Sequence, residues 1–127
     1  MARITQFGYA AIFTNHFQKT MEFYTEALGF SVEWSEGKKM AMLKLRGLRL
    51  LIHPAKLKPR RGESPLHLHL EVDDVDGFHA RLKGAGIKVP GSPKTMNWGH
   101  RTFRTYDPNG IEWEFYKRVR ARAGSKK

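Results

Sequence analysis

The chain has 127 residues, of which 40% are hydrophobic, 12% aromatic and 28% charged, and this composition predicts one globular domain while excluding collagen-like, coiled-coil and disordered proteins. The absence of cysteine excludes disulfides and thiolate ligands, and no apolar run approaches the ~18 residues of a membrane span, so we expect a cytoplasmic protein with no membrane partner. The net charge of +11, concentrated at 44–61 and 117–127, favours anionic partners.

The first half of the chain predicts a strand, a helix and three further strands. Apolar residues spaced three and four apart after Phe17 indicate the helix, and Gly29 stands where a C-terminal cap belongs. Alternating or continuous apolar runs between turn residues indicate the strands. In chain order the predicted elements are a strand at 6–13, a helix at 17–28, strands at 30–34, 40–45 and 48–53, and a basic linker at 55–65.

The second half repeats this order. Strict alternation at 66–72 predicts a strand that carries two histidines on one face, and Asp73 and Asp74 precede a helical spacing that ends at Gly86. By the same parity, Trp113 and Phe115 are expected to pack against a helix. The further predicted elements are a helix at 73–85, a short strand at 86–89, a loop at 90–99 and a final strand at 110–116.

The repeated order predicts an α+β fold of two βαβββ modules. We place these modules at about 4–54 and 66–117 within a single domain, 1–118, and we expect a flexible basic tail at 119–127. One helix covers one side of a four-stranded sheet, so the other side needs a partner. We therefore expect the free sheet faces of two modules, from one chain or two, to turn inward around a cleft.

Three stretches resemble the vicinal oxygen chelate superfamily, which includes glyoxalase I, fosfomycin-resistance transferases, extradiol dioxygenases and bleomycin-resistance proteins. They are FYTEALGF at 23–30, LHLHLEV at 66–72 and YDPNGIEWEF at 106–115, and the resemblance spans about residues 4–118. It implies two βαβββ modules that form a cup-shaped half-barrel, a small-molecule ligand bound in the cup, and a homodimer.

The resemblance also implies positions for metal ligands. These positions fall on Tyr9, Leu51, His67 and Glu114, of which only His67 and Glu114 are ordinary ligands for a divalent ion such as Fe, Mn, Zn or Ni. Tyr9 stands where a histidine is usual in the transferases and dioxygenases. The resemblance thus predicts a metal site at His67 and Glu114, and catalytic roles for Glu114 and Tyr9.

Neighbouring histidines offer further donors to the same cup. His53 shares a strand face with Leu51, and His69 shares one with His67, so either is a candidate third ligand, proton donor or substrate-binding group. The alternative is a metal-free polar cup, in which the histidines are hydrogen-bonded to Tyr9, Glu112 or Glu114.

Three other side chains are predicted to bind substrate. Arg49 alternates with Leu51 and His53, which directs it into the cleft, and Arg101 is suited to hold a carboxylate or phosphate. Trp98, beside Gly99, is suited to close over a ligand. The alternative is that Trp98 caps a sheet edge and that Arg101 is solvated.

These residues favour an enzyme that acts on a small anionic molecule. In the resembling family a bound ion stabilises an oxyanion as a Lewis acid, which implies a metal-dependent lyase, transferase or dioxygenase. The alternative function is a metal-free protein that binds a drug or metabolite. A basic module on nucleic acid ranks third, because no zinc-finger spacing, recognition helix or RNA-binding signature accompanies the basic tail.

Overall fold

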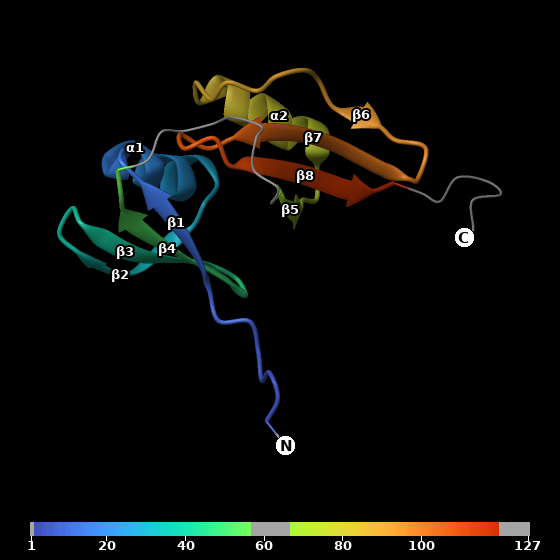
Figure 1. Ribbon diagram of the computed structural model, residues 1–127. Coiled ribbons are helices and arrows are strands. Elements are labelled where there is room, and N and C mark those ends of the chain that lie inside the picture. Colours follow the sequence, from blue (N-terminus) through green and yellow to red (C-terminus); the bar gives the residue numbers. More distant parts are fainter. Residues whose placement is uncertain (1, 57–66, 120–127) are drawn as a thin grey trace. The chain divides into compact units, whose positions relative to one another are not determined.

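A computed structural model describes residues 2–56 and 67–119 of the chain (Figure 1). They belong to two compact units, Met1–Pro59 and Arg60–Lys127, called here the first and the second unit. Within the described residues, each unit holds one four-stranded sheet and one helical segment. The α+β class and the two βαβββ modules predicted from the sequence are confirmed. Most of the predicted linker and of the basic tail lies outside the described residues.

The first unit contains a mixed sheet with the strand order β1-β4-β3-β2. The outer strand β1 runs parallel to β4, and the other pairs are antiparallel. Because β1 begins at Ala10, Tyr9 precedes the strand rather than lying in it. The elements are β1 (Ala10–Thr14), α1 (Phe17–Glu22), the π-helical segment η1 (Phe23–Ala27), β2 (Ser31–Glu36), β3 (Met40–Leu45) and β4 (Leu48–Pro54).

The helix of the first unit widens at its C-terminal end. The amide of Leu28 donates to the carbonyl of Phe23 at 3.1 Å, a five-residue spacing that defines the π-helical turn. Gly29, at φ 90°, then takes the left-handed conformation that lets the chain leave the helix. Tyr24 is fully buried and packs edge-on against Phe23 and Phe30, so this turn anchors the helix to the core.

The strands of the first unit bury alternate residues beneath this helix. In β4, Leu50 and Ile52 are fully buried, whereas Arg49, Leu51 and His53 are partly exposed on the opposite face. The apolar face therefore makes the core, and the other face is open within this unit.

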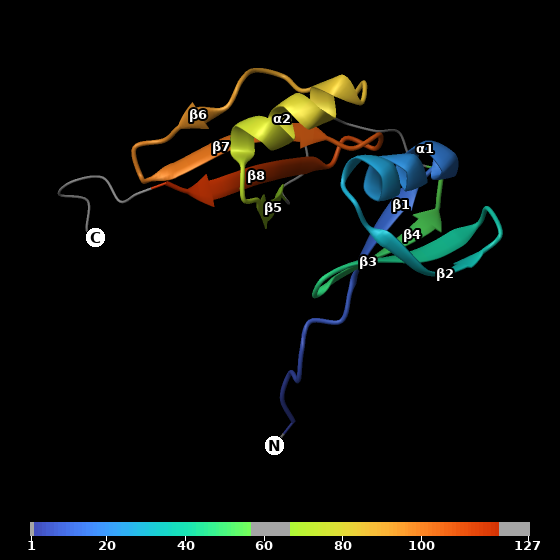
Figure 2. The same cartoon turned by 180° about the vertical axis from the view of Figure 1, so that it is seen from behind.

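The second unit repeats the arrangement with the strand order β5-β8-β7-β6 and with β5 parallel to β8. Asp74 caps the helix by accepting a hydrogen bond from the amide of Gly77 at 3.0 Å. Figure 2 shows this helix lying across β7 and β8. The elements are β5 (His67–Glu71), α2 (Val75–Gly84), β6 (Lys94–Thr95), β7 (His100–Tyr106) and β8 (Glu112–Arg118).

An aromatic cluster forms the core of the second unit. The ring of Phe78 on α2 lies 4.9 Å from that of Phe115 and 6.3 Å from that of Phe103. Trp113 and Phe115 are fully buried, which confirms the prediction that they pack on the helix side of the sheet.

The prediction of a short strand at 86–89 is wrong, because no strand lies between α2 and β6 in this described part of the chain. The fourth strand of this sheet is instead β6, which pairs with β7 through Lys94 and Thr95. The carbonyl of Lys88 accepts a hydrogen bond from the side chain of Thr105 at 2.8 Å, and Pro90 has no amide hydrogen to offer a neighbouring strand. Pairing therefore begins only beyond the prolines.

Replacing Trp113 with Ala should lower the free energy of unfolding by about 3–5 kcal/mol, because it removes a large, fully buried ring from the aromatic cluster. Trp98→Ala is the matched control, since Trp98 is 55% exposed and its removal should cost less than about 1 kcal/mol. Urea unfolding followed by circular dichroism measures both values. Equal losses in the two variants would contradict the packing described here.

Candidate functional site

The open face of the second sheet gathers ionisable side chains from three strands. Across β5 and β8, His67 lies opposite Glu112 and His69 opposite Glu114. Across β8 and β7, Arg104 lies opposite Glu114. Because side chains alternate along each strand, all five point away from the aromatic core. The register therefore places two histidines, two carboxylates and a guanidinium on one surface.

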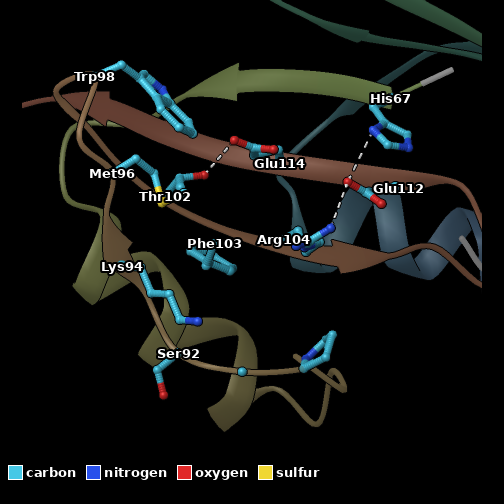
Figure 3. A pocket seen from close by; sticks show the side chains of 12 residues that line it. His67, Ser92, Lys94, Met96, Trp98, Thr102, Phe103, Arg104, Glu112 and Glu114 are labelled. Carbon is cyan, nitrogen blue, oxygen red and sulfur yellow. Dashed lines mark hydrogen bonds and ion pairs between the residues drawn. The ribbon is translucent and has the colours of Figure 1, made fainter.

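These strands form one wall of a pocket of about 410 Å³ within the second unit (Figure 3). This volume is in the range of pockets that hold small organic ligands. The other wall comes from the segment that contains β6 and the turn after it. The lining residues are His67, Pro90, Gly91, Ser92, Lys94, Met96, Trp98, Thr102, Phe103, Arg104, Glu112 and Glu114.

Glu112 is the most buried charged group of the pocket, with 5% of its side chain exposed. Its Oε2 atom lies 3.4 Å from Nδ1 of His67 and 3.6 Å from Nη1 of Arg104. Figure 3 shows these two side chains meeting the carboxylate from either side. A buried carboxylate is stable only when cations or hydrogen-bond donors compensate for lost water, and these two neighbours supply that compensation.

Glu114 has a different environment. The hydroxyl of Thr102 donates to its Oε2 atom at 2.8 Å, and Nδ1 of His69 lies 4.0 Å from the same oxygen. About a quarter of the Glu114 side chain is exposed. His67 and Glu114, the expected pair of metal ligands, do line one pocket, but the nearest carboxylate to His67 is that of Glu112.

The donor types of the pocket suit a divalent ion, but their arrangement does not form a three-ligand site. Among residues 2–56 and 67–119, no group of three or more His, Asp or Glu side chains is placed to hold a metal. His67 is turned to Glu112, and one oxygen of Glu114 is already bonded to Thr102. The metal assignment of His67 and Glu114 stays a prediction.

The second wall of the pocket carries Lys94, Met96 and Trp98. A turn closed by a hydrogen bond from the amide of Gly99 to the carbonyl of Met96, at 3.0 Å, presents the indole of Trp98 to solvent. Lys94 lies opposite Thr102 in the β6–β7 ladder and so shares its sheet face. The role of Trp98 in ligand binding stays a prediction, and its place in the pocket wall agrees with that role.

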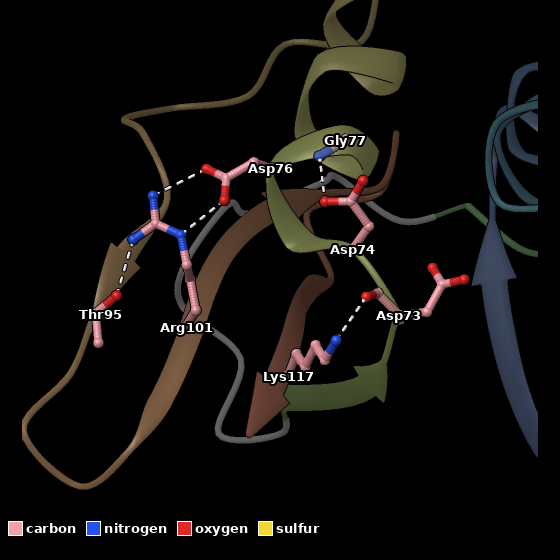
Figure 4. Close-up of polar contacts among 7 residues, drawn as sticks. All are labelled: Asp73, Asp74, Asp76, Gly77, Thr95, Arg101 and Lys117. Carbon is pink, nitrogen blue, oxygen red and sulfur yellow. Dashed lines mark hydrogen bonds and ion pairs between the residues drawn. The ribbon is translucent and has the colours of Figure 1, made fainter. Parts of the chain in front are cut away.

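Arg101 lies on the opposite face of the sheet from the pocket. Its guanidinium donates to both carboxylate oxygens of Asp76 on α2, each at 2.8 Å, and to the hydroxyl of Thr95 at 2.9 Å (Figure 4). It is not among the residues that line the pocket. The paired guanidinium lowers the pKa of Asp76, and the carboxylate in turn raises the pKa of Arg101. This arrangement ties β6 and β7 to the helix.

The other expected site residues belong to the first unit. Arg49 forms a two-bond ion pair with Glu33, at 2.8 and 3.0 Å. Nδ1 of His53 lies 2.8 Å from the carbonyl of Pro54, and its ring packs edge-on against Phe13. Tyr9 is half exposed. Their proposed roles in substrate binding and catalysis stay predictions.

Sequence reasoning did not select four of the charged or polar pocket residues, and it named Glu112 only as a hydrogen-bond partner. The four are Ser92, Lys94, Thr102 and Arg104. Glu112 shares a strand face with Glu114, so strand parity could have found it. Thr102 and Arg104 share a face of β7 in the same way. Lys94 carries no such signal, because the position of β6 was not predicted.

The fold and the site together define a class of protein. It is an α+β protein of two βαβββ modules, with a pocket of convergent polar side chains on one sheet. Residues 6–115 match the Glyoxalase/Bleomycin resistance protein/Dioxygenase superfamily, and the chain belongs to that superfamily. Among curated proteins, the uncharacterized protein YetH of Bacillus subtilis is 28% identical over 102 residues, which cover 76% of this chain and 85% of YetH.

Solved structures share the fold at low sequence identity. A glyoxalase/bleomycin resistance protein/dioxygenase from Nocardioides is 20% identical with a TM-score of 0.76, and the match covers 99% of this chain and 89% of that one. A mutant of the fosfomycin resistance protein FosX from Listeria monocytogenes, complexed with Mn(II) and 1S,2S-dihydroxypropylphosphonic acid, is 16% identical with a TM-score of 0.76. That match covers 91% and 93% of the two chains. In the described parts of our chain, no helix is long and apolar enough to cross a membrane.

Replacing Asp76 with Asn should make the melting temperature less dependent on acid pH. Folding lowers the pKa of Asp76, so its charge stabilises the folded state at neutral pH, and this stabilisation is lost as the pH falls through the lowered value. The variant should melt below the wild type at about pH 7, and the difference should shrink below about pH 4.

The matched control is Asp73→Asn, because the Asp73 carboxylate has no ion pair among residues 2–56 and 67–119 and only its carbonyl accepts a bond from Lys117. Its melting temperature should follow that of the wild type across the same pH range. A pH-independent deficit in Asp76→Asn would show that the ion pair with Arg101 does not form in solution.

Proposed function

We propose that this protein binds a small organic anion in the pocket of its second unit. The observation that carries the proposal is Lys94, which lines the pocket and forms no ion pair within residues 2–56 and 67–119. Arg104 adds a second cation, held by a single 3.6 Å contact with Glu112 that leaves most of its donors available. The chain's net charge of +11 adds a long-range attraction for anions.

The rest of the pocket suits the organic part of such a ligand. Trp98 and Met96 offer aromatic and apolar surface, whereas Glu114 and His67 offer groups that accept hydrogen bonds. A ligand that carries one acidic group and a compact, partly apolar body matches this combination. As parts of the same proposal we include a cytoplasmic location and a homodimer, and light scattering of the purified protein tests the dimer.

Replacing Lys94 with Ala should weaken binding of the anion about tenfold, because one charge-assisted contact is lost. A thermal-shift panel of small carboxylates, phosphates and phosphonates identifies a ligand, and quenching of Trp98 fluorescence then measures the dissociation constant. Lys83→Ala is the matched control, since this exposed lysine lies in the last turn of α2, outside the pocket lining. The proposal is wrong if no compound in the panel raises the melting temperature, or if both variants weaken binding equally.

A metal-dependent enzyme is the second candidate function. It is favoured by His67 and Glu114 lining the same pocket, and by FosX having been solved with Mn(II). It requires His67 to leave Glu112, Glu114 to leave Thr102, and a third donor such as His69 to join them. The first proposal needs no such rearrangement.

Chelation separates the two candidates. Under the first proposal, excess EDTA should leave the dissociation constant of the anion unchanged, and Mn(II), Zn(II), Ni(II) or Fe(II) should not raise the melting temperature. If the protein is a metal-dependent enzyme, a metal should raise the melting temperature of the wild type but not that of Glu114→Gln. Glu71→Gln, a control outside the pocket lining, should respond like the wild type. Turnover that EDTA abolishes would establish the second candidate in place of the first.

A further inference from the structure

The buried carboxylate of Glu112 lies beside the imidazole of His67. An ionised carboxylate can only accept hydrogen bonds, and its Oε2 atom lies 3.4 Å from Nδ1 of His67. A neutral imidazole that keeps this contact would carry its hydrogen on Nδ1, because the carboxylate has no hydrogen to donate. The lone pair then resides on Nε2, because the neutral ring has one donor nitrogen and one acceptor nitrogen.

Nε2 of His67 remains available to a ligand. The side chain of His67 is 43% exposed and lines the pocket. Within the described residues its ring makes no contact with a charged group other than Glu112. A ring nitrogen that is open to a ligand thus lies in the same pocket as the side chains of Arg104 and Lys94.

The second histidine of β5 is not held in the same way. Nδ1 of His69 is 4.0 Å from Glu114, beyond hydrogen-bond distance, and the same carboxylate oxygen accepts from Thr102 at 2.8 Å. Glu114 is also more exposed than Glu112, at 24% against 5%. The two His–Glu pairs look equivalent in the sequence, but only the pair of His67 and Glu112 includes a buried carboxylate.

We propose that Glu112 is a positioning residue that holds His67 in the Nδ1–H tautomer, so that Nε2 accepts a hydrogen bond from a ligand hydroxyl. The ligand class that follows is a hydroxy acid, whose acidic group pairs with Lys94 or Arg104 while its hydroxyl donates to Nε2. This inference rests on the proposed function, since it takes the pocket of the second unit as the binding site.

The tautomer of His67 can be measured without any ligand. In protein labelled with ¹⁵N-histidine at about pH 8, where unperturbed imidazoles are neutral, long-range proton–nitrogen spectra distinguish Nδ1–H from Nε2–H rings. Loss of one signal in His67→Gln assigns the residue. The wild type should show the Nδ1–H form for His67, and a wild-type ring in the Nε2–H form would overturn the proposal whether or not any variant folds.

Two glutamine variants test the cause. Glu112→Gln should shift His67 toward the Nε2–H tautomer, because the charge-assisted contact is lost. The matched control, Glu114→Gln, should leave the His67 tautomer unchanged, since that carboxylate lies beside His69. An unchanged His67 signal in Glu112→Gln would show that Glu112 does not set the tautomer.

A pair of acids tests the ligand class. The wild type should bind 3-phenyllactate about tenfold more tightly than 3-phenylpropionate, which lacks the hydroxyl, and Glu112→Gln should lose this preference while still binding 3-phenylpropionate. Equal affinity of the wild type for the two acids would overturn the predicted ligand class. Binding of neither acid would also contradict that class, whereas the proposed function fails only if the wider panel of anions fails as well.

Discussion

The pairing of β8 with a strand on each side is the constraint on which the chemistry of the second unit depends. Its register with β5 and β7 directs Trp113 and Phe115 into the core and places Glu112 and Glu114 on the open face. A slip of β8 by one residue would exchange the faces of these two pairs of side chains. The carboxylates of Glu112 and Glu114 would then be buried beneath α2, and the rings of Trp113 and Phe115 would be exposed. The same alternation that stabilises the sheet therefore also assembles the polar pocket.

Burial of one carboxylate organises the other charges. Glu112 is almost fully removed from water, and such a group is tolerated only beside donors or cations. His67 from one neighbouring strand and Arg104 from the other meet that requirement. Glu114, which keeps more contact with solvent, needs only the hydroxyl of Thr102. The unequal burial of two carboxylates on one strand face gives them different chemical environments.

The sequence predicted the βαβββ order because period-two alternation and helical spacing are local signals, and it predicted the core positions of Trp113 and Phe115 for the same reason. It named Glu112 among the possible partners of the histidines, but it could not assign Glu112 to His67, because a parallel register is set by tertiary packing and not by either strand alone. It directed Arg101 to the ligand because the start of β7 was unknown, and that start decides which face the side chain takes.

The two faces of the second sheet carry different kinds of side chain: one face holds the buried core and the other lines the pocket. The aromatic cluster of α2, β7 and β8 lies on the same face as the ion pair of Arg101 and Asp76, whereas Lys94, Met96 and Trp98 line the pocket from a two-residue strand and the turn after it. An exposed side chain on that wall, such as Trp98, can therefore be replaced at a smaller cost to folding than the buried rings. Proteins that share this fold can in this way differ in the small molecules that they bind.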